Sequence, residues 1–65
     1  MNKKQILEIT ENSVLFSIQT NLYKIDDLNK DKIEFITENL IKIKENSRTE
    51  VYLNVKDIRV IKVKK

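Results

Sequence analysis

The sequence predicts a small α+β domain with two layers: a mostly antiparallel sheet of four or five strands, and one helix packed on one face of it. Three observations lead to this class. Apolar and polar residues alternate near both ends of the chain, a helical apolar period occupies its middle, and 65 residues suffice for one domain at most. We therefore expect a single domain over residues 1–65 with the element order ββ(β)αββ.

Two strands are expected at the start of the chain, over about residues 4–10 and 14–19. The segment between them, residues 11–13, reads Glu-Asn-Ser, which is typical of a turn. Apolar residues at alternate positions define the inward face of each strand. These inward residues are Leu7, Ile9, Val14, Phe16 and Ile18.

Residues 22–25 fit either a short third strand or an extended lead-in to a helix. Thr20 and Asn21 interrupt the alternation just before them. Of the two readings we favour the short strand.

A helix is expected over about residues 29–45. Asn29 suits the N-cap, and Asn46 stands where a glycine usually ends a helix. Acidic residues come early and lysines late, which complements the helix dipole. The apolar stripe at helical spacing consists of Ile33, Ile36, Leu40 and Ile43.

Two more strands are expected over about residues 49–55 and 58–63. In the first, Val51, Leu53 and Val55 alternate with polar residues. The second has apolar residues on both faces, so it needs cover on two sides. It is either a central strand of the sheet or an edge strand that binds a partner or a second copy of the chain.

The chain contains no Gly, Pro, Cys, His, Trp or Ala. Without His and Cys, the common zinc, redox and general-base designs are excluded, so we expect no enzyme, no cofactor and no metal. The carboxylates of Asp26, Asp27 and Asp31 are explained by the start of the expected helix. The missing Gly, Pro and Ala fit an AT-rich genome, and we expect three asparagines to take the turn and cap positions of glycine: Asn12, Asn21 and Asn46.

The positive charge is concentrated after residue 47, where the chain has six basic residues and two acidic ones, Glu50 and Asp57. This segment is either a solvated tail or a nucleic-acid-binding surface that contacts phosphates, with Tyr23 and Tyr52 available for stacking. Eleven lysines against two arginines argue against sequence-specific reading. The basic residues are Arg48, Lys56, Arg59, Lys62, Lys64 and Lys65.

Binding to a protein partner is the leading hypothesis. Phe35 and Ile41 lie off the apolar stripe of the expected helix, on opposite sides of it, so they would form exposed off-stripe surface of the helix, and 58–63 would offer a sheet edge. For Phe35 there are two readings: it is an exposed anchor for a partner, or it covers the 20–25 segment at the edge of a small core. The expected function is a non-enzymatic, cytoplasmic inhibitor or adaptor from a phage or mobile element, acting on a protein partner or as a homodimer, with no membrane association. Its candidate residues are Phe35, Ile41, Tyr52, Ile58, Val60, Ile61 and Val63.

Overall fold

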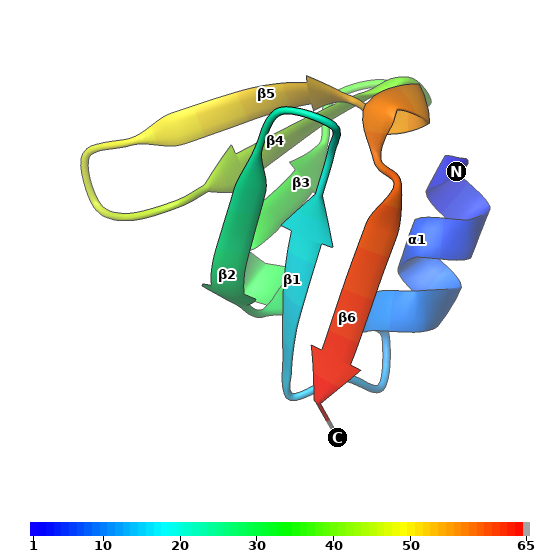
Figure 1. The fold of residues 1–65 in the computed structure, drawn as a ribbon, viewed down its shortest axis with the longest axis horizontal. Coiled ribbons are helices and arrows are strands. Elements are labelled where there is room, and N and C mark those ends of the chain that lie inside the picture. The colour runs from blue at the N-terminus through cyan, green and yellow to red at the C-terminus, as the bar shows by residue number, and fades with distance from the viewer. Residues whose placement is uncertain (65) are drawn as a thin grey trace.

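A computed structural model of the chain, which describes residues 1–64, contains one helix and six strands (Figure 1). Two short 3₁₀ turns, η1 (Lys30–Lys32) and η2 (Val55–Asp57), lie between strands. The other elements are α1 (Lys3–Thr10), β1 (Leu15–Gln19), β2 (Lys24–Leu28), β3 (Ile33–Phe35), β4 (Leu40–Lys44), β5 (Glu50–Asn54) and β6 (Val60–Lys64).

The strands form two antiparallel sheets of three strands each. One has the order β2-β1-β6 and the other β3-β4-β5. Figure 1 shows the first sheet in front of the second, with η1 leading from β2 into β3 and η2 leading from β5 into β6. The α+β class is confirmed, but the expected single sheet and the order ββ(β)αββ are wrong.

The core lies between the inner faces of the two sheets and the helix. Ile6 of α1 is fully buried there with residues from both sheets. Burying such aliphatic side chains is the main source of stability in a chain of this size. The nine core residues are Ile6, Phe16, Ile18, Ile25, Leu28, Ile41, Ile43, Val55 and Ile58.

The N-terminal segment is a helix and not the expected strand. The Asn2 side chain accepts a hydrogen bond from the Gln5 amide at 2.9 Å, and the Gln5 side chain accepts one from the Asn2 amide at 3.0 Å. This capping box satisfies amides that an isolated helix end leaves unpaired. Ile6 and Thr10, four residues apart, then face the core together.

The helix expected over residues 29–45 is absent, and this segment forms η1, β3 and β4 instead. Its apolar residues fit a period of two as well as a helical one: Ile33 and Phe35 face the core from β3, and Ile41 and Ile43 face it from β4. Thr37 makes the turn between the strands, because its hydroxyl accepts hydrogen bonds from the amides of Asn39 and Leu40. β-branched residues favour this extended arrangement.

The remaining strand expectations agree with the structure within a few residues. The expected strands 14–19, 49–55 and 58–63 correspond to β1, β5 and β6. The segment 22–25 does lead into a strand, β2, which begins at Lys24 and continues to Leu28.

A β-bulge interrupts the pairing of β1 with β2. Phe16 is opposite Leu28 while Ile18 is opposite Ile25, so β2 holds one extra residue. Asp27 lies in this bulge with φ 58°, the one positive φ among residues 1–64. The expectation that Asn12, Asn21 and Asn46 replace glycine holds for their place in turns, but none of them adopts a positive φ.

The helix closes one side of the molecule between β6 and β3. Figure 1 shows α1 beside β6, and the two elements are in contact. Lys3 of α1 reaches the β3 side, where its ammonium lies 5.4 Å from the centre of the Phe35 ring and 3.7 Å from a carboxylate oxygen of Glu38. Within residues 1–64, no strand pairs with the outer edge of β6, and α1 lies next to this strand (Figure 1).

Candidate functional site

Two of the residues expected at a partner surface belong to the core. Ile41 is completely buried and Ile58 is 3% exposed. Phe35 is half-buried, packs against the core and lies under the Lys3 ammonium. Because residues 29–45 are not helical, the exposed helix face that Phe35 and Ile41 were expected to form does not exist.

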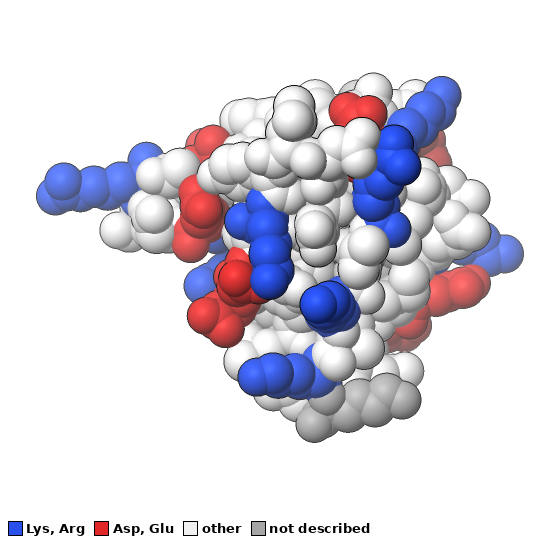
Figure 2. All heavy atoms as spheres, in the orientation of Figure 1, with Lys and Arg blue, Asp and Glu red and all other residues white. Residues whose placement is uncertain are grey.

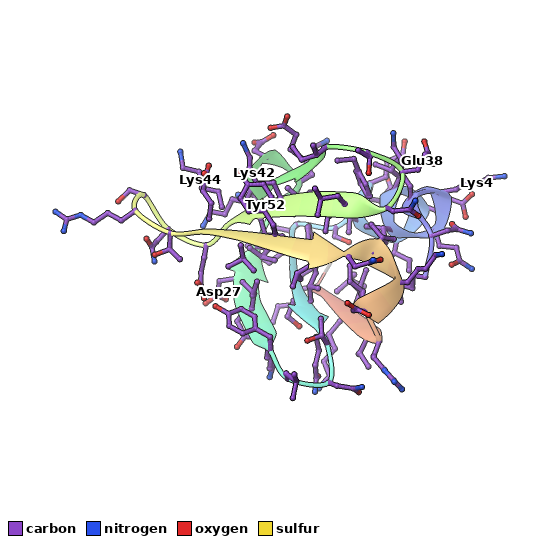
Figure 3. The ribbon with its side chains drawn as sticks, turned by 90° about the horizontal axis from the view of Figure 1, so that it is seen from above. Lys4, Asp27, Glu38, Lys42, Lys44 and Tyr52 are labelled. Atoms are coloured by element: carbon purple, nitrogen blue, oxygen red, sulfur yellow. The ribbon has the colours of Figure 1, made fainter. Side chains whose placement is uncertain are left out.

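Tyr52 is exposed, on the outer face of the β3-β4-β5 sheet. Tyr52 of β5 is opposite Lys42 of the central strand β4, and both are labelled in Figure 3. On the other side of β4, Glu34 of β3 is opposite Lys42. The Lys42 ammonium lies 3.3 Å from Glu34 and 3.7 Å from Glu50. The hydrogen bond and charge of Glu34, followed by the charge of Glu50, raise the pKa of Lys42 above its ordinary value. Lys42 therefore has a carboxylate on each side of it, which stabilises its charged form.

The edge strand β6 presents apolar side chains on both of its faces. Its pairing with β1 places Val63 opposite Phe16 and Val60 opposite Gln19. Phe16 is buried, so Val63 is on the inner face and Val60 on the outer face. They are 38% and 39% exposed. A half-exposed valine on each face is consistent with a strand that lacks a neighbour.

Four of the expected nucleic-acid residues gather near β6. Lys62 and Lys64 lie on its outer face, since they are opposite Ser17 and Leu15, while Lys56 and Arg59 lie just before it. Figure 2 looks onto this face and shows basic side chains spread across it, with acidic ones towards its β2 side. Lys24 of β2 adds a further basic group.

Arg48, another of the expected basic residues, does not belong to this surface. Arg48 lies in the turn between β4 and β5, which projects away from β6 in Figure 1. Lys65 lies outside the described residues.

A shallow groove of about 540 Å³ follows the outer face of the β2-β1-β6 sheet. Lys62 and Lys64 line one side of it, and Asp26 and Asp27 line the other. Lys24 lies 3.7 Å from Asp26 and is partly neutralised by it. The bulge at Asp27 turns these carboxylates towards the groove, and no pattern in the sequence pointed to it.

The structure offers little for metal binding or for nucleophilic catalysis. No group of three or more acidic side chains within residues 1–64 is close enough to hold a metal ion. Ser17 lies in the groove opposite Lys62, but the hydrogen bonds formed within residues 1–64 do not join a serine hydroxyl to a lysine. Ser13 instead donates to the Ile9 carbonyl at 2.9 Å.

Comparison of the chain with protein-family models, with curated protein sequences and with solved structures found no match. No helix within residues 1–64 has the length and apolar character needed to cross a bilayer. The function must therefore be argued from the surfaces described above.

Proposed function

We propose that this chain is a non-enzymatic binding module, an inhibitor or adaptor of the cytoplasm, that pairs the edge of β6 with an extended segment of a partner protein. In strand addition, backbone hydrogen bonds supply affinity and alternate side chains supply specificity. Of the two partner surfaces expected from the sequence, the proposed site is the sheet edge, since residues 29–45 form no α-helix.

The position of β6 carries the proposal. β6 is the last strand of its sheet, and four of its five residues are exposed. β1, its neighbour, alternates between buried and half-buried residues. An added strand would cover Val60 on one face and Val63 on the other, and each burial would contribute about 1 kcal/mol.

The absence of His and Cys from the sequence supports the non-enzymatic part of the proposal, because most general bases and thiol nucleophiles come from these residue types. A phage or mobile-element origin is part of the proposal because a short chain without His or Cys suits an inhibitor or adaptor of such an element.

The proposal can be tested by NMR on the ¹⁵N-labelled protein, titrated with capped peptides of strand length. We expect chemical-shift changes and slowed amide exchange in β6 and β1, with little change in β3 and β4. Val63→Lys should abolish these changes, because a charge on the inner face of an edge strand blocks an added strand.

Val14→Lys is the matched control, because Val14 is also an exposed valine, at 66%, but precedes β1. It should leave peptide binding intact. If Val63→Lys and Val14→Lys bound the peptide equally well, strand addition at β6 would be contradicted. Chemical-shift changes centred on β5 in the wild-type protein would contradict it too.

The basic outer face favours a second candidate, the binding of a nucleic-acid backbone. Lys24, Lys56, Arg59, Lys62 and Lys64 are gathered by the fold from two separate parts of the sequence. Of the two stacking residues expected from the sequence, Tyr52 lies on the other sheet, while Tyr23 is exposed next to Lys24 and donates its hydroxyl to Glu45. Contacts would therefore be mainly to phosphates, with Tyr23 as the one expected stacking residue beside a lysine of this surface.

This candidate predicts that affinity for a single-stranded oligonucleotide falls steeply with salt. Replacing either Lys62 or Lys64 by Gln, in two single variants, should reduce the slope of log K against log salt by about 0.7 for each lost phosphate contact. Lys44→Gln, on the other sheet (Figure 3), is the matched loss of one charge and should leave the slope unchanged. An unchanged slope in the Lys62 and Lys64 variants would dismiss this candidate.

A further inference from the structure

We propose that the segment added to β6 carries acidic side chains at alternate positions, with β-branched apolar residues between them. This inference rests on the proposed strand addition at β6 and specifies the chemistry of the partner. It follows from three features of β6: lysines that form no ion pair with another residue of the range 1–64, valine and isoleucine on the opposite face, and the electrostatic cost of pairing β6 with a second copy.

Lys62 and Lys64 are on the outer face of β6, and their neighbours on β1 carry no charge. Lys62 is opposite Ser17 and Lys64 is opposite Leu15. The ion pairs formed within residues 1–64 involve Lys3, Lys24 and Lys42, but neither of these two lysines. Two ammonium groups therefore stand side by side on one face, two residues apart, without a carboxylate on the strand next to them.

The other sheet of the same protein shows how such a lysine is satisfied. Lys42 lies on the central strand β4, and each neighbouring strand supplies it with a carboxylate, Glu34 from β3 and Glu50 from β5. Lys62 has the equivalent position on β6 but a neighbour on one side alone. An added strand with Glu opposite Lys62 and Lys64 would complete the arrangement that Lys42 already has.

The inner face of β6 requires the opposite character. Ile61 and Val63 point inward beside Ile18 and Phe16, and Val63 remains 38% exposed. Because successive residues of a strand point to opposite faces, the partner must alternate acidic and apolar residues. Running antiparallel to β6, its core would read Glu-Val-Glu-Val, with the first Glu opposite Lys64 and the last Val opposite Ile61.

A second copy of β6 is a poor partner for this edge. Edge-to-edge pairing about a twofold axis is antiparallel and keeps each face continuous, so residues of the same parity are opposite each other. Lys62 is then opposite Lys62 or Lys64 of the other copy, or diagonal to Lys62 when it is opposite Val60. Like charges opposite each other destabilise a sheet, so these lysines disfavour self-pairing while favouring an acidic strand.

The inference is tested with capped, fluorescently labelled peptides built on Glu-Val-Glu-Val, and with matched peptides that carry Gln or Lys in place of Glu. Wild-type protein should bind the Glu peptide about 2- to 30-fold more tightly than the Gln peptide, since two cross-strand ion pairs are gained. The Lys peptide should bind least. The preference should shrink as salt is added.

Charge reversal gives the sharpest comparison. The double variant Lys62→Glu/Lys64→Glu should prefer the Lys peptide, while the matched double variant Lys44→Glu/Lys4→Glu should keep the wild-type preference for Glu. Both doubles change the net charge equally, so a difference between them reports the site and not the overall charge. Figure 3 shows Lys44 and Lys4 on opposite sides of the molecule.

The outcomes separate this inference from the proposed function. Equal binding of the Glu and Gln peptides, with shifts still centred on β6, would overturn the acidic preference and leave strand addition standing. Binding of none of the three peptides would overturn both. A wild-type dimer in solution that Val63→Lys dissociates would show a second copy as the occupant, and an oligonucleotide that binds at β6 while the Glu peptide does not would show a nucleic acid; either result overturns the inference.

Discussion

The hydroxyl of Tyr23 donates to the carboxylate of Glu45, with its oxygen 3.1 Å from one carboxylate oxygen and 3.3 Å from the other. Tyr23 directly precedes β2, and Glu45 directly follows β4. The contact therefore ties the front sheet to the turn that leads into β5.

The contact predicts an alkaline dependence. The hydrogen bond to Glu45, with burial and the Glu45 charge, raises the pKa of Tyr23 above its ordinary value of 10.0. Since the folded pKa exceeds the unfolded one, the stabilisation is fully present below pH 10 and is lost as pH rises through the folded pKa. Glu45→Gln should lower the pKa of Tyr23 in a near-ultraviolet absorbance titration of a Tyr52→Phe background. An unchanged titration would show that the two side chains do not interact in solution.

The capping box predicts that the N-terminal helix depends on two side chains. Replacing Asn2 by Ala should reduce the free energy of unfolding by about 1 kcal/mol, because it removes the acceptor for the Gln5 amide. Urea denaturation measures the loss. Asn12→Ala, in the turn after α1, is the matched control and should cost less. If both variants lose equally, the cap is not the source of the effect.

Asp27 predicts an unusual response to substitution. Its positive φ suits glycine and is especially unfavourable for a β-branched residue. Asp27→Val should destabilise the protein by about 1–2 kcal/mol relative to Asp27→Gly. The same pair of substitutions at Asp26, its exposed neighbour on β2, should show no preference for glycine. Thermal unfolding of the four variants decides the matter, and a β-branched preference at residue 27 would refute the bulge geometry.

Phe35 predicts a change in stability and not in association. The sequence-based hypothesis placed Phe35 on exposed helix surface that binds a partner. Because Phe35 packs against the core from β3, we now expect a loss of about 2–4 kcal/mol in unfolding free energy. Tyr52→Ala, at a residue 55% exposed, should cost far less. A thermal midpoint unchanged by Phe35→Ala would return Phe35 to the list of surface residues.

The strands that could be predicted are those whose alternation has one reading. In 49–55 and from Phe16 to Gln19, side chains alternate between the two faces of a strand, and a helix would scatter the apolar residues around its surface. The 29–45 segment allowed two readings, because Ile33, Ile36, Leu40 and Ile43 fit a helix while Ile33, Phe35, Ile41 and Ile43 fit two strands. The segment 4–10 was predicted as a strand but is helical, although the sequence already contained Asn2 and Gln5, which form its capping box.

Of the candidate residues, Val60, Ile61 and Val63 could be assigned to a strand from the sequence, because β-branched residues favour extended structure. The outcome for Ile58 and Ile41 could not be foreseen. Ile58 precedes β6 and turns inward after η2, and Ile41 is buried because β4 is the middle strand of its sheet.

The sequence by itself determined the strands around Phe16, Leu53 and Ile61 and the concentration of positive charge near the C-terminus; the α+β class was predicted with its helix in the wrong segment. These properties depend on local alternation and on composition, which neighbouring residues reveal. The tertiary structure alone decided that residues 33–44 are strands and that Lys62 lies on an edge without a carboxylate beside it. Both depend on which strands become neighbours, and that is settled by burying one shared core between two sheets and a helix.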